Sequence, residues 1–262
     1  MSTSVFDALS VALRAGDPVA LATVVEGPNV GAKLLVGPSA PAVGTLGNAD
    51  LDRVVSRDAL GELESGLTST RHYGEHGEAR EEAVSVFIES FAPPPHLVIF
   101  GAVDFTAALA KAGKLLGYRV TVCDARAVFA TIARFPMADE VVNDWPDRYL
   151  QKVADELGPR DAVCVLTHDH KFDVPAIMAA TRTRVGYIGA MGSRRTHAQR
   201  VDRLREAGVT DDEIARVMSP IGLDLGARTP EETAISICAE IIAKRTGRVA
   251  PSLRDAEGPI HT

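Results

Sequence analysis

Apolar and polar positions follow two different patterns on either side of residues 93–95. In the first part, short apolar runs bounded by Gly or Pro alternate with two amphipathic stretches, which is typical of a small α+β domain. The predicted helices cover residues 6–15 and 50–64, and the predicted strands cover residues 19–25, 31–37, 42–46, 69–73 and 83–90.

The clearest break in the pattern is Pro93-Pro94-Pro95. Three consecutive prolines favour an extended conformation and cannot continue a helix or a central strand. We therefore predict an N-terminal α+β domain over residues 1–92, a linker over 93–95, a second domain over 96–248 and a tail over 249–262.

Beyond the prolines, continuously apolar runs alternate with helical patterns. The predicted strands cover residues 97–100, 119–123, 161–166 and 184–188, and the predicted helices cover 106–116, 149–157, 174–180, 194–207, 210–216 and 230–245. Continuous apolar strands are typical of parallel sheets that are covered on both faces. The pattern predicts a Rossmann-like α/β domain with a doubly wound parallel sheet.

Composition narrows the class of partner. The 262 residues carry a net charge of −7, so we do not expect a nucleic-acid partner. No apolar run reaches the ~18 residues typical of a membrane span, and the N-terminus lacks a secretory signal pattern. The three cysteines, Cys123, Cys164 and Cys238, lie far apart in apolar settings, which predicts buried, reduced thiols in a cytoplasmic protein.

The turn after the strand at 97–100 has part of a dinucleotide-binding pattern. Gly101 is present, but Val103 and Thr106 stand at the second and third glycine positions. Asp124 follows Gly101 by 23 residues, where an acidic residue would bind ribose hydroxyls. Packing alone and nucleotide binding are equally supported explanations of this unit.

A polar cluster follows the strand at 161–166, with His168, Asp169, His170 and Asp173. Ligands bind beyond the carboxyl ends of strands in open α/β sheets, so we expect His168 and Asp169 to face a ligand. A lone His-x-His is a weak metal signal, and we predict no metal site. The alternative is a polar loop in which Asp173 caps a helix beginning at Val174.

Two further turns carry glycines and charged residues. The first contains Gly189, Gly192, Ser193, Arg194 and Arg195. Arginine is unfavourable at the start of a helix, so binding of a phosphate or carboxylate is the natural reason for this pair. The alternative is that these arginines lie on the surface and pair with Asp or Glu.

The second turn contains Gly222, Asp224 and Arg228, and we expect it to line the same cleft. Thr229 and Glu232 after it form a capping box for the last helix. The sequence holds no Gly-x-Ser-x-Gly, P-loop or His-Glu-x-x-His motif, so we predict no catalytic residue.

Three segments follow one another in the order Thr-His-Asp-His at 167–170, Gly-Ala-Met-Gly-Ser-Arg-Arg at 189–195, and Ser-Pro-Ile-Gly-Leu-Asp-Leu-Gly-Ala-Arg-Thr-Pro-Glu-Glu at 219–232. Together they resemble the XdhC/CoxI family of accessory proteins of molybdenum hydroxylases. The strands at 20–25 and 31–36, the proline linker and residues 135–141 also fit, so the resemblance runs from about Val19 to Arg245.

The resemblance implies an accessory protein that is not an enzyme, usually a homodimer. It would bind the molybdenum cofactor (molybdopterin) and deliver it to a xanthine dehydrogenase or carbon monoxide dehydrogenase type hydroxylase. The expected cofactor-binding residues are Gly101, Asp124, His168, Asp169, Gly189, Gly192, Ser193, Arg194, Arg195, Gly222, Asp224 and Arg228. The alternatives are an NAD(P)- or FAD-binding oxidoreductase using the Asp124 end of the sheet, and a nucleotide-binding scaffold module.

The chain departs from the family at two turns. At residues 44–52, Asp50 stands where the family often has cysteine, and a carboxylate is a harder ligand than a thiolate. Gly47, Asn48 and Asp50 are the expected contacts of the N-terminal domain. At residues 101–105, Gly-Ala-Val-Asp-Phe replaces the usual Gly-Ala-Gly-His-Val. Both departures predict altered ligand handling.

Overall fold

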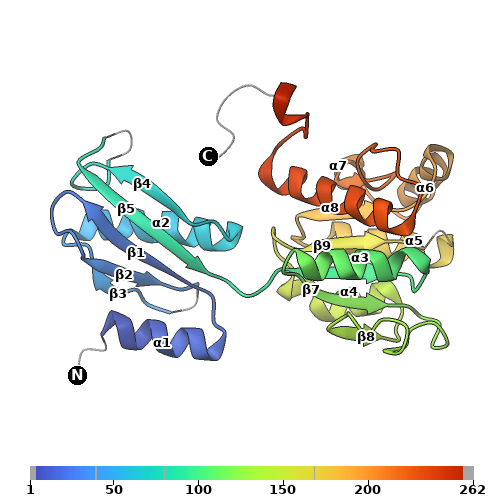
Figure 1. The fold of residues 1–262 in the computed structure, drawn as a ribbon, viewed down its shortest axis with the longest axis horizontal. Coiled ribbons are helices and arrows are strands. Elements are labelled where there is room, and N and C mark those ends of the chain that lie inside the picture. Colours follow the sequence, from blue (N-terminus) through green and yellow to red (C-terminus); the bar gives the residue numbers. More distant parts are fainter. Residues whose placement is uncertain (1–3, 39, 79–80, 168, 256–262) are drawn as a thin grey trace. The chain divides into compact units, whose positions relative to one another are not determined.

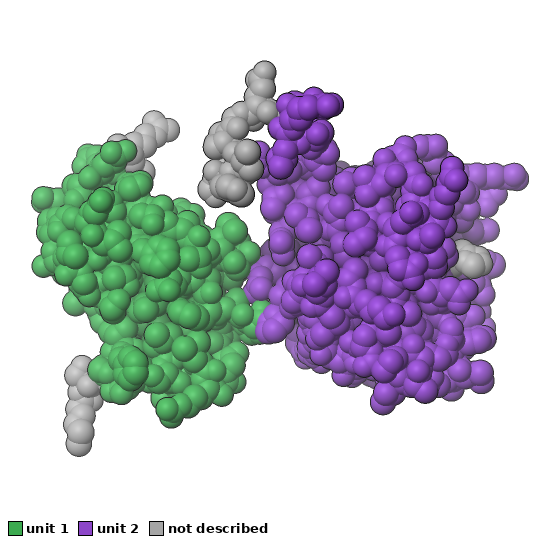
Figure 2. Space-filling model, viewed as in Figure 1, with its two compact units in different colours: residues 1–93 green, residues 94–262 purple. Residues whose placement is uncertain are grey.

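The computed structural model describes residues 4–38, 40–78, 81–167 and 169–255 (Figure 1). The chain divides into two compact units, residues 1–93 and residues 94–262, which are coloured separately in Figure 2. Among the described residues, no helix combines the length and the apolar character needed to cross a membrane.

Unit 1 is built on a five-stranded antiparallel sheet in the order β3-β2-β1-β5-β4. Its elements are α1 (Val5–Ala15), β1 (Val19–Glu26), β2 (Lys33–Val36), β3 (Val43–Thr45), α2 (Ala49–Ser65), β4 (Ser69–Tyr73) and β5 (Val84–Phe91). The two helices and five strands predicted from the sequence are confirmed, with ends that shift by a few residues.

Alternation along β1 explains how two helices share one sheet. Ala20, Ala22 and Val24 pack in the cluster that holds the apolar face of α2. Val19 and Leu21 pack with Ala12 of α1 in a separate cluster. Successive side chains of a strand point to opposite faces, so α1 and α2 cover opposite faces of this sheet.

Unit 2 contains a six-stranded parallel sheet in the order β11-β10-β9-β6-β7-β8. The strands are β6 (His96–Phe100), β7 (Arg119–Cys123), β8 (Glu140–Val142), β9 (Ala162–Val165), β10 (Tyr187–Ala190) and β11 (Val217–Met218). Numbered from β6, this is the 3-2-1-4-5-6 order of the Rossmann fold, and its direction of winding reverses between β6 and β9. The predicted fold class is confirmed.

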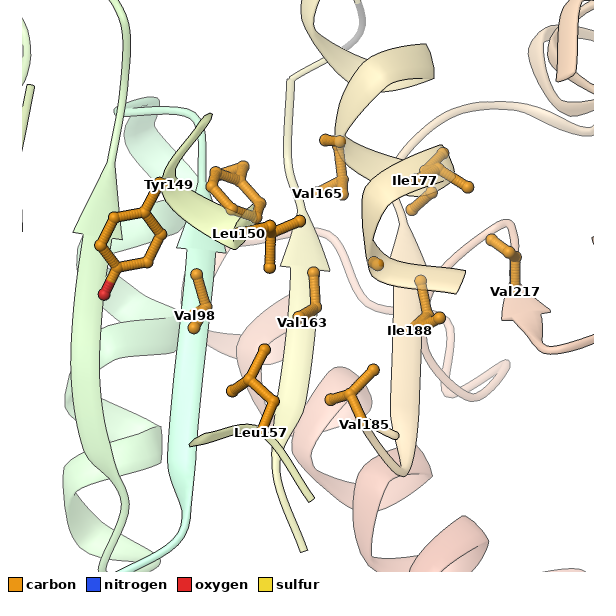
Figure 3. Close-up of a cluster of buried hydrophobic side chains, with 14 of the residues drawn as sticks. Val98, Tyr149, Leu150, Leu157, Val163, Val165, Ile177, Val185, Ile188 and Val217 are labelled. Carbon is orange, nitrogen blue, oxygen red and sulfur yellow. The ribbon is translucent and has the colours of Figure 1, made fainter. Parts of the chain in front are cut away.

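Helices cover both faces of the parallel sheet. They are α3 (Asp104–Leu115), α4 (Pro146–Val153), α5 (His170–Thr181), α6 (Arg194–Glu206), α7 (Asp211–Ala215) and α8 (Pro230–Thr246), with the short 3₁₀ turns η1 (Ala154–Glu156) and η2 (Leu253–Asp255). Leu97 and Ile99 of β6 face α3 and α8. Val98 and Phe100 face the other side of the sheet. There they belong to a cluster that also contains Leu150 of α4 and Ile177 of α5 (Figure 3).

Several boundaries in unit 2 differ from the prediction. β8 and β11 were not predicted, because they are strands of three and two residues without a long apolar run. β10 begins at Tyr187 rather than Arg184, and the Arg216 guanidinium instead donates to the carbonyls of Thr183 and Val185. Pairing with β9 begins at Tyr187 and Ala162, so residues 184–186 precede the strand.

The start of α5 is a second correction. The proposed cap at Asp173 is wrong, because the helix begins at His170 and Asp169 is its N-cap. The Asp169 side chain accepts a hydrogen bond from the Lys171 N–H at 3.0 Å. The sequence placed the start too late because Pro175 lies inside the helix, where proline is normally unfavourable.

Candidate functional site

The carboxyl ends of the parallel strands form one edge of the unit 2 sheet, here called the carboxyl edge. The strands run in one direction, so the turns that follow β6, β7, β9, β10 and β11 all meet at this edge. These turns, together with the first two residues of α6, carry the predicted residues of unit 2, apart from Gly189 inside β10. His168 lies outside the described residues.

The turn between β6 and α3 is closed by hydrogen bonds within the chain. The Ala102 N–H donates to Asp124 Oδ2 at 2.7 Å, and the Val103 N–H donates to Thr106 Oγ1 at 3.3 Å. Thr106 Oγ1 in turn donates to the carbonyl of Gly101. An arriving phosphate would therefore find the first N–H groups of this turn already bound.

Gly101 has its own structural reason in the same turn. Its φ of 105° lies in the left-handed region, and an added Cβ would come within 2.9 Å of the Thr167 backbone nitrogen. Glycine is thus required here by backbone conformation and by the close approach of the turns after β6 and β9.

Asp124 is 5% exposed, and both of its oxygens are engaged. Oδ1 accepts from the Arg126 backbone N–H and Nε, both at 2.9 Å, and Arg126 Nη2 lies 2.7 Å from Oδ2. Burial acts to raise the pKa of Asp124, but the hydrogen bonds from Arg126 and from the backbone lower it below the usual value. The carboxylate could reach ribose hydroxyls only if the Arg126 side chain moved away.

The turn between β10 and α6 has the opposite character. Ser193 is the N-cap of α6, and its hydroxyl accepts from the Thr196 N–H at 3.1 Å. Arg194 and Arg195 are exposed, and neither side chain has a hydrogen bond or ion pair with any residue that the structure describes. Two guanidinium groups at the carboxyl edge are therefore available to an anion.

Arg200, which the sequence did not single out, contacts this turn from the buried side of α6. It is 1% exposed, with Nη2 2.9 Å from Asp173 Oδ2 and 2.8 Å from the Met191 carbonyl. Nη1 donates to Ser219 Oγ at 3.1 Å. The helical spacing to the buried Leu204, four residues later, is the signal that could have placed Arg200 on the inner face of α6.

The turn between β11 and α8 is held by a hydrogen bond at Gly222, whereas its later charged side chains have no partners in the described structure. The Gly222 N–H donates to Glu240 Oε2 at 2.9 Å, and the same oxygen accepts from the Tyr187 hydroxyl at 2.6 Å. Asp224 and Arg228 are exposed, and their side chains have no partner among the residues described.

Two predicted glycines in this region fit closely against neighbouring groups. Gly189 lies within β10, where an added Cβ would collide with the Ile221 side chain. At Gly192 the φ is 145°, and a Cβ would approach the Thr196 side chain to 3.2 Å. The missing side chain of Gly189 allows the turn after β11 to approach β10 closely. The missing side chain of Gly192 allows the turn after β10 to approach α6.

The capping box of α8 is confirmed. Thr229 Oγ1 accepts from the Glu232 N–H at 3.1 Å, and the Glu232 carboxylate accepts from the Thr229 N–H at 3.1 Å. Backbone N–H groups of Arg228 and Thr229 lower the pKa of Glu232. The box fixes the start of α8 at the carboxyl edge.

Asp169 is exposed, and the His170 ring lies beside it with Nδ1 3.9 Å from Oδ1. Within the described residues, His, Cys, Asp and Glu form no group of three that could hold a metal ion. Asp169 is the last residue of the turn between β9 and α5, and its carboxylate lies at the carboxyl edge.

In unit 1, Gly47 and Asn48 line a cavity of about 130 Å³ together with His76. Asn48 is the N-cap of α2, and its Nδ2 lies 2.6 Å from His76 Nδ1. Asp50 is not among the residues that line this cavity. It lies in the first turn of α2, with its carboxylate 3.7 Å from the Arg53 guanidinium.

The three cysteines are free and buried. Burial raises the pKa of Cys123 to about 12 and that of Cys238 to about 11, and it raises the pKa of Cys164 well above its usual value. The reactive form of cysteine is the thiolate, so these residues belong to the core rather than to a nucleophilic site.

Curated relatives match the chain over part of their length. It is 33% identical over 165 residues to a probable xanthine dehydrogenase subunit of Bacillus subtilis (strain 168), covering 63% of this chain and 47% of that protein. It is 36% identical over 84 residues to the molybdenum cofactor insertion chaperone PaoD of Escherichia coli (strain K12), covering 32% of this chain and 26% of PaoD. The chain thus spans less than half the length of these relatives.

A crystal structure from Bacillus halodurans, described as a xanthine dehydrogenase, has the same fold. Its TM-score is 0.54 at 21% identity, and the match covers 95% of this chain and 98% of that one. The family model of the XdhC Rossmann domain matches residues 97–241, and the model of the XdhC and CoxI family matches residues 12–74. The chain therefore belongs to the XdhC and CoxI family.

Proposed function

We propose that this chain binds the molybdenum cofactor and delivers it to a hydroxylase of the xanthine dehydrogenase type. The observation that carries the proposal is the pair Arg194 and Arg195, exposed at the carboxyl edge without a partner among the described residues. The insertion chaperone PaoD and the probable xanthine dehydrogenase subunit of Bacillus subtilis support this role, because each matches part of the chain.

The chemistry of the cofactor fits the turn between β10 and α6. Molybdopterin carries a phosphate, and guanidinium groups bind phosphate oxygens through paired, charge-assisted hydrogen bonds. Arg194 and Arg195 would hold the phosphate, with Ser193 beside them at the helix N-terminus. Asp169, Asp224 and Arg228 would line the rest of the site.

The turn between β6 and α3 does not favour the dinucleotide alternative. A bound pyrophosphate normally takes its hydrogen bonds from the N–H groups at this position. Here Asp124 and Thr106 accept the hydrogen bonds of Ala102 and Val103. We therefore assign Gly101 and Asp124 to the wall of the site rather than to phosphate or ribose contacts.

The wider proposal follows the family resemblance. The chain would act as a homodimer in the cytoplasm, where three well-separated cysteines remain reduced. Its client would be a molybdenum hydroxylase. Sedimentation of the purified chain tests the dimer, and a monomer at every concentration would contradict it.

Binding is tested with cofactor released from a purified molybdenum enzyme. The chain is mixed with it, separated by gel filtration and assayed for molybdenum and for pterin fluorescence after oxidation. Wild type should carry both in a fixed ratio. Arg194→Ala with Arg195→Ala should weaken binding at least tenfold, which is about 1.4 kcal/mol.

A matched control is Arg182→Ala with Arg203→Ala. Both arginines are also exposed. Arg182 follows the end of α5 and Arg203 lies in the last turn of α6, so both are away from the carboxyl edge. This variant should bind like wild type. Wild-type protein that leaves the column without molybdenum and pterin would contradict the proposed function.

A further inference from the structure

The loop between β7 and β8 presents large apolar side chains at its surface. We call residues 125–135 the apolar loop. Val128 is 81% exposed, Ile132 is 73% exposed and Phe129 is 39% exposed. Single apolar residues are common on protein surfaces, but three within five positions of one loop form a patch, which is typical of an interaction site.

The conformation of the apolar loop is held by its own backbone and by a buried anchor. The Phe129 N–H donates to the Arg126 carbonyl at 2.9 Å, and the Phe135 N–H donates to the Thr131 carbonyl at 3.2 Å. Phe135 is buried in a cluster with Val122. Val128 and Ile132 are thus presented in an ordered loop, which lowers the entropy cost of binding a partner.

Positive charge borders this patch. The apolar loop contains Arg126 and Arg134 and no acidic residue, on a chain with a net charge of −7. Arg126 stacks over the Phe129 ring at 4.6 Å from its centroid, and Arg134 lies over the same ring at 5.4 Å. Arg126 pairs with Asp124, whereas Arg134 has no carboxylate partner within the described parts of the chain.

The apolar loop also begins at the carboxyl edge, directly after Asp124. The turn that bears Arg194 and Arg195 lies at the same edge. A cofactor that is transferred between two proteins must leave through a surface that the receiving protein covers. The apolar loop is placed at the border of that surface.

We propose that the apolar loop docks the hydroxylase client, through an apolar pocket on the client that is bordered by carboxylates. This inference rests on the proposed function and adds the surface through which delivery takes place. Val128 and Ile132 would enter the pocket, and Arg134 would pair with a carboxylate at its rim.

The test uses the full chain, loaded with cofactor, and the purified apo form of the xanthine dehydrogenase of the same organism. Val128→Ser with Ile132→Ser should weaken binding to the apoenzyme at least tenfold. The amount of bound molybdenum and pterin should not change, because neither residue lies in the proposed cofactor site.

The control is Leu115→Ser with Leu116→Ser, at the end of α3 and hence at the opposite edge of the sheet. Leu115 is 84% exposed, so this variant also removes exposed apolar surface. It should bind the apoenzyme like wild type. If the Val128→Ser, Ile132→Ser variant retains cofactor and binds the apoenzyme as wild type does, the docking inference alone is overturned. The same holds if this variant loses self-association but still binds the apoenzyme normally. Wild type without cofactor would instead overturn the proposed function.

Charge reversal tests the rim separately. Arg134→Glu should slow association with the apoenzyme severalfold at low salt, and the difference from wild type should shrink as salt is added. Arg203→Glu, in the last turn of α6, should have little effect. An association rate that is the same for Arg134→Glu and wild type at every salt concentration would contradict a role for Arg134.

Discussion

Asp124 and Arg200 illustrate how far single residues could be understood from the sequence. The position of Asp124 at a strand end was predictable, because it follows an apolar run. Its hydrogen bond to the Ala102 N–H joins two segments 22 positions apart, and no local pattern encodes that contact. Arg200 is buried although polar residues dominate α6, so the composition of the helix gives no sign of its burial.

The pKa of Asp124 leads to a prediction about acid stability. The folded-state pKa lies below the ordinary value of ~3.9, so the contribution of Asp124 is complete above that value and is lost as the pH falls through the folded pKa. Asp124→Asn should cost about 2 kcal/mol of unfolding free energy at pH 7. The cost should shrink below about pH 4.

Urea unfolding at stepwise lower pH measures this cost. Asp155→Asn is the matched control, because Asp155 is exposed in η1. Its unfolding free energy should follow that of wild type. A cost of Asp124→Asn that stays constant down to pH 3 would show that the carboxylate charge does not stabilise the fold.

The pair Arg200 and Asp173 should behave as a buried ion pair. Arg200→Leu leaves the Asp173 carboxylate buried without its partner, and should cost about 3–5 kcal/mol. Replacing both residues with Leu should cost less than the sum of the two single changes, because no unpaired charge remains. Denaturant unfolding of the four proteins provides the measurement, and strictly additive costs would refute this coupling.

At the scale of elements, the periodicity of apolar residues identified long elements well and short ones poorly. β1 of unit 1 and the central strands β6 and β9 of unit 2 have apolar patterns that match their burial. β8 and β11, with three and two residues, were missed, whereas the equally short β3 was found because Gly and Pro bound the run that contains it. Before β10, Arg216 donates to the carbonyls of Thr183 and Val185 from at least 31 positions away, and no local pattern encodes these contacts.

The capping box gives a prediction for one element. Thr229→Ala removes the side chain that accepts from the Glu232 N–H, and should lower the unfolding free energy by about 1 kcal/mol. Thr229→Ser should retain most of the stability, because the hydroxyl can form the same bond. Thermal and urea unfolding would compare these variants, and equal losses for Ala and Ser would exclude capping as the cause.

At the scale of the whole molecule, parallel strands explain why motifs that are far apart in the sequence meet at one edge. The order of strands and helices was enough to predict that meeting. It was not enough to show which turns are closed. In the β6–α3 turn the backbone N–H groups of Ala102 and Val103 donate within the chain, whereas the β10–α6 turn leads into two exposed arginines, Arg194 and Arg195, that have no partners in the described structure.

This difference predicts the response to dinucleotides. NAD, NADP and FAD should give no saturable rise in Tm, because the N–H groups of the β6–α3 turn are bound within the chain. The molybdenum cofactor should raise Tm with its concentration, as any ligand of the folded state does. A saturable rise of several degrees with one dinucleotide would restore the oxidoreductase alternative.

The most direct test of the central claim is transfer of the cofactor. Chain loaded with molybdenum cofactor is mixed with purified apo xanthine dehydrogenase of the same organism, and molybdenum in each protein is measured over time along with the activity gained. Molybdenum should leave the chain and enter the apoenzyme in step with activity. The variant with Arg194→Ala and Arg195→Ala should bind less cofactor, and it should therefore transfer less molybdenum to the apoenzyme per mole of chain. Delivery would be contradicted if molybdenum stayed on the chain and the apoenzyme gained activity no faster and no more fully than with an equal amount of free cofactor.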